Sequence, residues 1–245
     1  MDIKRILGLN KPDIKKMERN KDIKGLTRLL KFDQDESVRR EAAFAIGKIT
    51  GPQTEEAKNH IVEESVTELM NSLKTGDVKQ QKQAARDLVD IGRPAVKPLL
   101  KLLEDDEWKL RWYASEILGE IGDKEAVQGL IVAMGDDNSG VRSKSMLSLV
   151  EIGKAAIDPL IKALSDENWQ IRRHAAEALG VISTKKAVKP LIETLNDKNS
   201  WVQKTATESL GNIGDKRAVD PLKNMLKADN LEVRDAVSEA LEKLG

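Results

Sequence analysis

The stretch DDEWKLRWYASEILGEIGDKEAVQGLIVAM, residues 105–134, has a pattern that returns in register along most of the chain. The pattern is an apolar residue, arginine, a pair of small residues, Leu-Gly and Ile-Gly, followed by a segment of the form Val-X-X-Pro-Leu. One apolar residue ends the first half of each copy: Ile49, Ile91, Ile121, Ile152, Ile182, Ile213 and Leu244. After Ile91 the period is 30 or 31 residues, which predicts stacked supersecondary units and not a coiled coil.

Each copy predicts two helices. In the first half of the third copy the apolar and small residues fall on one helical face: Leu110, Ala114, Ser115, Leu118 and Ile121. Prolines at 98, 159, 190 and 221 share one column, where they suit the first turn of a second helix. No strand pattern competes, so the sequence predicts an all-α solenoid of six to seven two-helix units, forming one elongated domain over residues 1–245.

The two ends and one insertion depart from the period. Residues 1–32 align with an incomplete unit and predict an atypical N-terminal cap, and residues 230–244 predict a C-terminal half repeat. Residues 51–62 interrupt the period without apolar periodicity, which predicts a loop on one rim and the first site of proteolysis. The second unit has Gln81 in the arginine column, and we expect it to be the weak joint of the array.

Bulk composition excludes several classes of function. The 41 basic and 41 acidic residues cancel, so nucleic acid is an unlikely partner despite ten basic and four acidic residues among the first 31. The chain has no cysteine, which fits a reducing compartment. Neither a signal peptide nor a membrane span is evident. We therefore expect a cytoplasmic, monomeric protein that does not bind membranes.

The motif resembles the HEAT-like repeats named after phycobilisome lyases, here in VRREAAFAIGKIT, LRWYASEILGEIGDKEAVQGL, IRRHAAEALGVISTKKAVKPL and VQKTATESLGNIGDKRAVDPL. The resemblance covers nearly the whole chain and implies the solenoid fold. It does not imply one activity, because similar repeats occur in lyases, hydroxylases, reductase tails and scaffolds. A di-iron hydroxylase needs several His-Glu pairs, whereas this chain has only His60 and His174.

The resemblance also implies a polar ladder between units, in which an aspartate lies six residues before the arginine. The pairs with this spacing are Asp33 with Arg39, Asp105 with Arg111, Asp136 with Arg142, and Asp166 with Arg172. Gln203 follows Asp197, and Ala228 precedes Arg234, so we expect a weaker ladder there and at Gln81.

In the resembling family the first, arginine-bearing helices line the concave face. Positions one and five after the arginine project together, opposite the apolar stripe. Residues of these two rows, together with Tyr113 and the aromatic Trp201, supply the candidate partner-binding residues: Arg40, Phe44, Lys82, Arg86, Trp112, Tyr113, Glu116, Leu147 and Trp201. Exposed aromatic residues are typical of binding hot spots, although tryptophans that pack over neighbouring repeats would give the same pattern.

We therefore expect a non-catalytic scaffold that needs no metal or cofactor. Its expected partner is an extended or helical protein segment with an acidic, apolar portion. Two alternatives stay open: a subunit of a chromophore lyase or another enzyme complex, and a nucleic-acid-binding protein that uses the basic N-terminal third.

Overall fold

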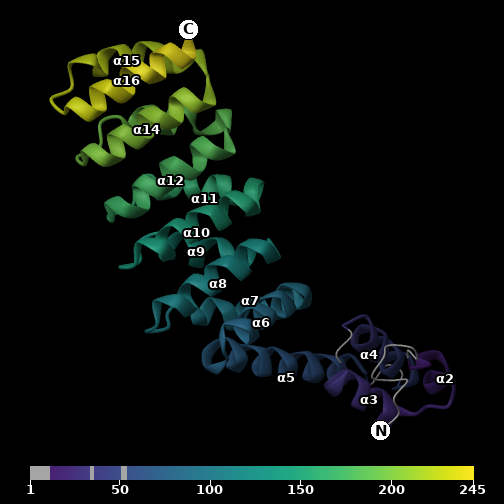
Figure 1. Cartoon of the computed structure of the whole chain (residues 1–245). Helices are drawn as coiled ribbons and strands as arrows, with labels where there is room; N and C mark the ends of the chain where they lie inside the picture. Colours follow the sequence, from purple (N-terminus) through teal and green to yellow (C-terminus); the bar gives the residue numbers. More distant parts are fainter. Residues whose placement is uncertain (1–11, 34–35, 51–53) are drawn as a thin grey trace. The chain divides into compact units, whose positions relative to one another are not determined.

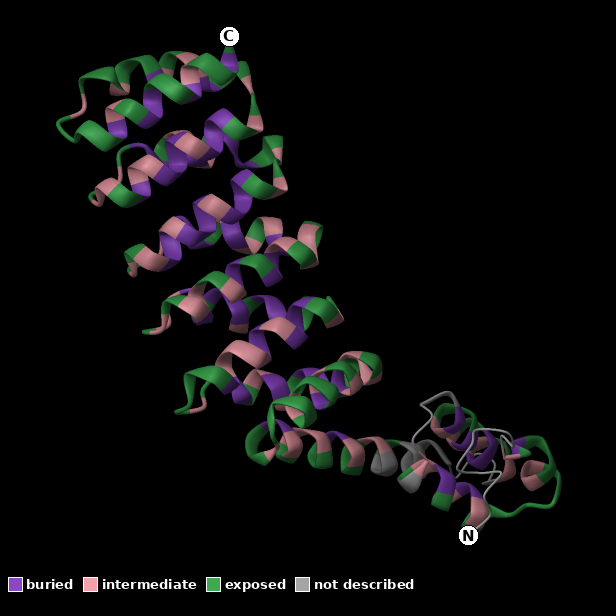
Figure 2. Ribbon diagram, viewed as in Figure 1, coloured by how far each residue is buried: buried purple, intermediate pink, exposed green. Residues whose placement is uncertain are grey.

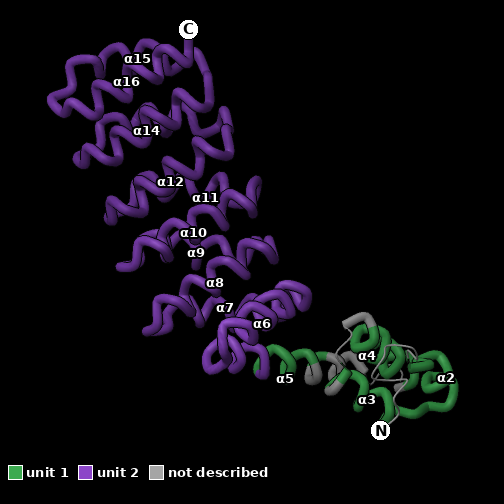
Figure 3. The backbone as a smooth tube through the Cα atoms, viewed as in Figure 1, with its two compact units in different colours: residues 1–67 green, residues 68–245 purple. Residues whose placement is uncertain are grey.

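The computed structural model describes residues 12–33, 36–50 and 54–245, and the chain divides into two compact units, residues 1–67 and 68–245 (Figures 1 and 3). This division differs from the single elongated domain that the repeat predicts. Over the described ranges the regular structure is helical, which confirms the all-α fold class. None of the helices in these ranges is long and apolar enough to cross a membrane.

Unit 1 contains α2 (Ile14–Arg19), α3 (Ile23–Phe32) and α4 (Glu36–Thr50). Asp13 and Asp22 cap α2 and α3 by accepting hydrogen bonds from backbone N–H groups. The helices share an apolar core that includes Ile14, Leu26 and Ala42. The described residues of this core lie between positions 14 and 49.

The predicted loop at 51–62 is wrong over 54–62, because α5 runs from Thr54 to Thr75. Between Pro52 and Gly76 the sequence contains neither proline nor glycine and has five glutamates, which favour helices. Lack of apolar periodicity therefore did not exclude a helix over these residues. The boundary between the two units falls within this helix, after Thr67.

Unit 2 is a regular stack of helix pairs (Figure 1). Its first helices, those that carry the arginine column, are α6 (Val78–Ile91), α8 (Trp108–Ile121), α10 (Ser139–Ile152), α12 (Trp169–Ile182), α14 (Ser200–Ile213) and α16 (Leu231–Leu244). Its second helices are α7 (Arg93–Leu102), α9 (Val127–Ala133), α11 (Ile157–Ala163), α13 (Val188–Thr194) and α15 (Val219–Asn224). The last helix, α16, is a first helix without a second helix after it, and it spans the half repeat predicted at 230–244.

The proline column lies in the first turn of α11, α13 and α15, as predicted, but not in the first turn of α7. Pro159 is the third residue of α11, and Pro98 is the sixth residue of α7. The difference arises because short 3-10 turns precede most second helices: η2 (Lys124–Ala126), η3 (Gly153–Ala156), η4 (Lys185–Ala187) and η5 (Lys216–Ala218), with η6 (Met225–Lys227) following α15. Helix α7 has no such turn before it and begins at Arg93, so Pro98 falls in its second turn.

Small residues allow the first helices to stack closely. Ala114, Ser115 and Leu118 of α8 are buried, as are Ala175, Ala176 and Leu179 of α12 (Figure 2). A Cβ atom added at Gly119 would lie 2.5 Å from Oγ of Ser148 and 2.8 Å from its Cα. Glycine is therefore required there by the approach of the next helix, and the same contact recurs between Gly180 and Ser209.

Candidate functional site

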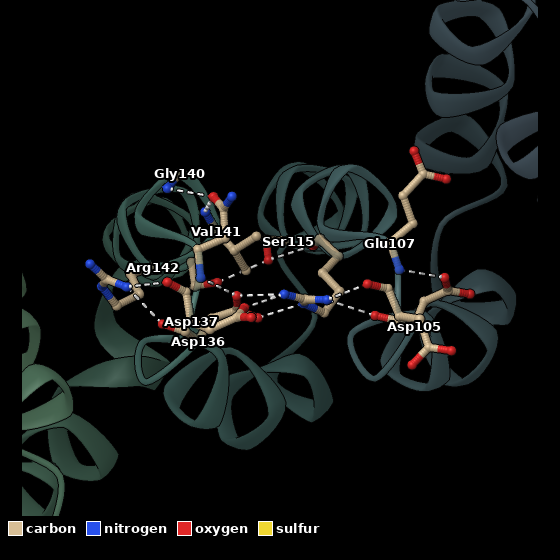
Figure 4. A network of polar contacts seen from close by, with 12 residues as sticks. Asp105, Glu107, Ser115, Asp136, Asp137, Gly140, Val141 and Arg142 are labelled. Atoms are coloured by element: carbon tan, nitrogen blue, oxygen red, sulfur yellow. Dashed lines mark hydrogen bonds and ion pairs between the residues drawn. The ribbon is translucent and has the colours of Figure 1, made fainter.

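The arginine column of unit 2 joins successive repeats through two kinds of contact. Arg111 donates from Nη1 to the carbonyl oxygens of Asp105 (2.8 Å) and Asp106 (3.1 Å), which end the preceding connector. Its Nε and Nη2 donate to the carboxylate of Asp136 in the next repeat, at 2.6 and 2.8 Å (Figure 4). Nη2 also reaches Oδ1 of Asp137. The aspartate six residues before the arginine thus offers its backbone carbonyl, whereas the carboxylate that pairs with the arginine belongs to the next repeat.

Arg172 repeats this arrangement with Asp197, at 2.6 and 2.9 Å, and with the carbonyls of Asp166 and Glu167. Both side chains are almost fully buried, with 5% and 9% exposure. Arg39 in unit 1 donates to the Asp33 carbonyl. Within residues 136–182, all of which the structure describes, Arg142 donates only to the carbonyls of Asp136 and Asp137.

Glutamine substitutes for arginine in part. Gln203 Nε2 donates to the Asp197 carbonyl at 2.7 Å, and Gln81 Nε2 donates to the Leu73 carbonyl at 2.9 Å. At the second unit the missing carboxylate contact is replaced by Lys74, whose Nζ lies 2.8 Å from Oδ2 of Asp105. The joint at which we expect a weaker ladder therefore has a polar contact of another form, built from a residue outside the arginine column.

The carboxylates of this ladder are held in their charged form. Burial by itself would raise the pKa of Asp197, but the guanidinium of Arg172 and the N–H of Asn199 hold that pKa below its ordinary value. Arg111 and the N–H of Asn138 do the same for the pKa of Asp136. Asp197 and Asp136 also accept the N–H groups of the residues two positions on, which orders each connector. These side chains are consequently engaged in structure and are not offered to a ligand.

Trp112 lies half-buried between two repeats. Its ring meets Tyr113 edge-on, with centroids 5.5 Å apart. Nζ of Lys144, from α10, lies 4.5 Å from the Trp112 ring centroid and 3.0 Å from Oε1 of Glu116. Trp112 and Glu116 of α8 therefore both contact Lys144 of α10, and Tyr113 packs against Trp112. These contacts support the interpretation that Trp112 packs between neighbouring repeats.

Leu147 and Trp201 remain more open to solvent. Leu147 on α10 is 46% exposed and Trp201 on α14 is 48% exposed. Lys204 Nζ lies 5.6 Å from the Trp201 ring centroid and 3.5 Å from Oε2 of Glu232. We call the exposed part of the first helices of unit 2, including Leu147, Trp201, Lys144 and Lys204, the first-helix face.

The remaining candidates divide between the two units. Lys82 and Arg86 are exposed on α6 of unit 2. Arg40 is exposed and Phe44 is 67% exposed on α4 of unit 1, where Lys48 Nζ lies 4.8 Å from the Phe44 ring centroid. The predicted track therefore consists of two separate sets, one in each unit.

Sequence reasoning missed the lysines that cover the aromatic rings. Lys204 could have been found from its position three residues after Trp201, since residues so spaced are neighbours on a helix. Lys144 lies 32 positions after Trp112 in the sequence, and its contact depends on the register of two stacked helices. His174 is buried and lies 3.3 Å from Glu177, whose pKa it lowers. No cluster of three or more potential metal ligands occurs among the residues that the structure describes.

The chain belongs to the HEAT-repeat family. A family model for HEAT repeats matches residues 64–149, 96–165 and 157–242, and a model for the PBS lyase HEAT-like repeat matches residues 38–75. Such a fold is an interaction architecture in which stacked units present a long ordered surface. The repeat class predicted from the sequence is confirmed.

Among curated proteins, the uncharacterized phycocyanin operon protein Z of Pseudanabaena tenuis is 32% identical over 110 residues, which is 41% of this chain and 54% of that protein. The chain thus matches about half the length of that relative. A designed armadillo repeat protein in complex with the peptide (KR)4 is 20% identical over 74% of this chain and 99% of that one, with a TM-score of 0.44. The complex of CpcE and CpcF of phycocyanin lyase from Nostoc is 21% identical over 72% and 98%, with a TM-score of 0.38.

Proposed function

We propose that this protein is a non-catalytic scaffold that binds a protein segment along the first-helix face of unit 2. In the proposed arrangement this face is the concave side of the solenoid. Apolar side chains of the partner contact Leu147 and Trp201, while its acidic groups meet Lys144 and Lys204. The two lysines are held beside aromatic rings by Glu116 and Glu232, so little side-chain freedom is lost when they bind.

One observation carries this proposal: Leu147 and Trp201 are large apolar side chains left about half exposed on helices whose other large apolar residues are mostly buried. The repeat itself does not need them, because equivalent positions in other repeats of unit 2 are polar, such as Glu177 for Leu147 and Lys109 for Trp201. Large exposed apolar groups beside ordered charges are typical of binding surfaces.

The proposal is tested by comparing exposed apolar residues from the two helix layers. A partner captured from the native extract is identified, and its affinity is measured for Leu147→Asp, Trp201→Ala and Val132→Asp. Val132 is the matched control, since it is 63% exposed but lies on the second helix α9. We expect the first two variants to weaken binding by at least about tenfold, as for hot-spot residues, and Val132→Asp to bind normally. Equal affinity of all three folded variants would contradict the proposal.

A role in a chromophore-lyase complex is a second candidate. It is favoured by the match of residues 38–75 to the PBS lyase HEAT-like repeat and by the partial relationship to the phycocyanin operon protein. In that case the first-helix face would hold another subunit or a phycobiliprotein. Binding of a tetrapyrrole by the purified chain, followed by absorbance, separates this candidate from a scaffold that binds protein alone.

A further inference from the structure

The contacts between first helices are not uniform along unit 2. In α8, α12 and α14 a glycine lies next to the following first helix: Gly119, Gly180 and Gly211. Added Cβ atoms at these positions would lie 2.5 to 3.0 Å from the nearest atoms of Ser148, Ser209 and Ala240. The backbones are therefore in contact at these joints, and a larger side chain would force them apart.

Helix α10 has Val150 in place of this glycine, and α12 offers Ala178 where the neighbouring units have Ser148 and Ser209. The serines matter because each donates a hydrogen bond across its joint: Ser148 Oγ to the Ser115 carbonyl at 2.7 Å, and Ser209 Oγ to the Ala176 carbonyl at 2.9 Å. Alanine has no donor for an equivalent bond. The α10–α12 contact is accordingly less extensive than those of α8 with α10 and of α12 with α14.

The polar ladder is interrupted at the same joint. Arg111 and Arg172 each donate hydrogen bonds to a carboxylate of the next repeat. Arg142, in the repeat between them, donates only to the backbone carbonyls of Asp136 and Asp137, in the connector that precedes its own helix. The ion pair that does cross the joint, Lys186 with Asp158, joins the other helix layer and is 62% and 66% exposed. Exposed ion pairs contribute little to stability.

We infer that the α10–α12 joint is a hinge between two stiffer blocks, α8–α10 and α12–α16. Among the joints between first helices from α8 to α16, only this one lacks the close glycine contact, the serine bond and the arginine–carboxylate contact together. Closely packed helices resist bending, since packed interiors do not deform continuously, and bending therefore concentrates where packing and polar contacts are weakest. The inference rests on helix stacking alone and holds whether or not the first-helix face binds a partner.

Pulsed electron–electron double resonance tests the hinge, because the chain has no native cysteine to compete for spin labels. Glu120→Cys with Val181→Cys spans two repeats across the α10–α12 joint. Val181→Cys with Lys243→Cys spans two repeats within the second block, and all three positions are exposed and share one column of the repeat. We expect a wider distance distribution for the first pair than for the second.

A second experiment uses a variant that restores the missing glycine–serine contact at the α10–α12 joint. Val150→Gly with Ala178→Ser recreates the Gly119–Ser148 contact and should narrow the distribution of the 120–181 pair. Ser143→Gly is the matched control, because it adds a glycine to an exposed position of α10 without restoring any contact, and it should leave that distribution wide. Equal widths for the two labelled pairs, or a 120–181 distribution that the repair leaves unchanged, would overturn the hinge.

Discussion

Asp197 shows at the scale of a single residue why the ladder matters for stability. Its carboxylate is nearly buried and receives two hydrogen bonds from Arg172. We expect Asp197→Ala to lower the free energy of unfolding by about 3 kcal/mol, since it leaves a buried guanidinium without its counter-charge. Asp158→Ala, which removes an exposed pair with Lys186, should cost no more than about 1 kcal/mol. Urea denaturation measures both, and equal losses would show that burial does not distinguish these pairs.

The same carboxylate predicts a pH dependence with a definite sign. Because the folded-state pKa of Asp197 lies below the ordinary value of 3.8, its contribution to stability is fully present above that value. It is lost as pH falls through the lowered folded-state pKa. The wild-type protein should therefore lose stability on acidification below about pH 4 more steeply than Asp197→Asn, which has no carboxylate to protonate. Parallel curves would contradict the assignment.

The sequence predicted the arginine and aspartate columns but not the full geometry of their contacts. The six-residue spacing of Asp105 and Arg111 places a carbonyl in reach, and this contact follows from local chain geometry. The carboxylate partner of Arg111, 25 residues later, is set by how two repeats stack. The position of Lys144 Nζ over the Trp112 ring could not be predicted either, because it depends on the register between α8 and α10.

At the scale of helices, glycine determines how closely first helices approach. Gly119→Ala would place a methyl group 2.5 Å from Oγ and 2.8 Å from Cα of Ser148, and the backbone cannot yield without separating α8 from α10. We expect a loss of about 1–3 kcal/mol, the usual cost of overpacking. Gly129→Ala is the control, because its new methyl group meets only the flexible ends of leucine side chains, nearest Leu100. Alanine also has a higher helix propensity than glycine. A thermal unfolding scan in which both variants match the wild type would refute this account.

Helix boundaries were predictable wherever the repeat was intact. The end of α8 at Ile121 and the end of α12 at Ile182 coincide with the apolar residue that closes each first half. The failure came at α5, where charged helix formers without an apolar stripe were interpreted as a loop. Periodicity detects apolar faces, so a helical segment whose sequence has no apolar stripe gives no such signal.

At the scale of the whole molecule, the repeat period predicted the family and the stacking of unit 2, while the division at residue 67 was not foreseen. The period continues through that point in weakened form, and the inserted residues lengthen a helix instead of closing a loop. The candidate surface stays a prediction. Leu147 and Trp201 are exposed as a binding site requires, whereas Trp112 packs between repeats.

Site-specific photo-crosslinking tests the central claim, that the first-helix face of unit 2 binds a protein segment. A photoreactive phenylalanine analogue is placed at position 147, 201 or 132, one variant at a time, and crosslinked peptides are mapped by mass spectrometry in the native extract. All three native side chains are more than 45% exposed, so each probe is accessible. We predict that positions 147 and 201 crosslink to the same segment of one protein and that position 132 does not. Crosslinking from position 132 alone, or from none of the three while a partner is bound, would contradict the claim.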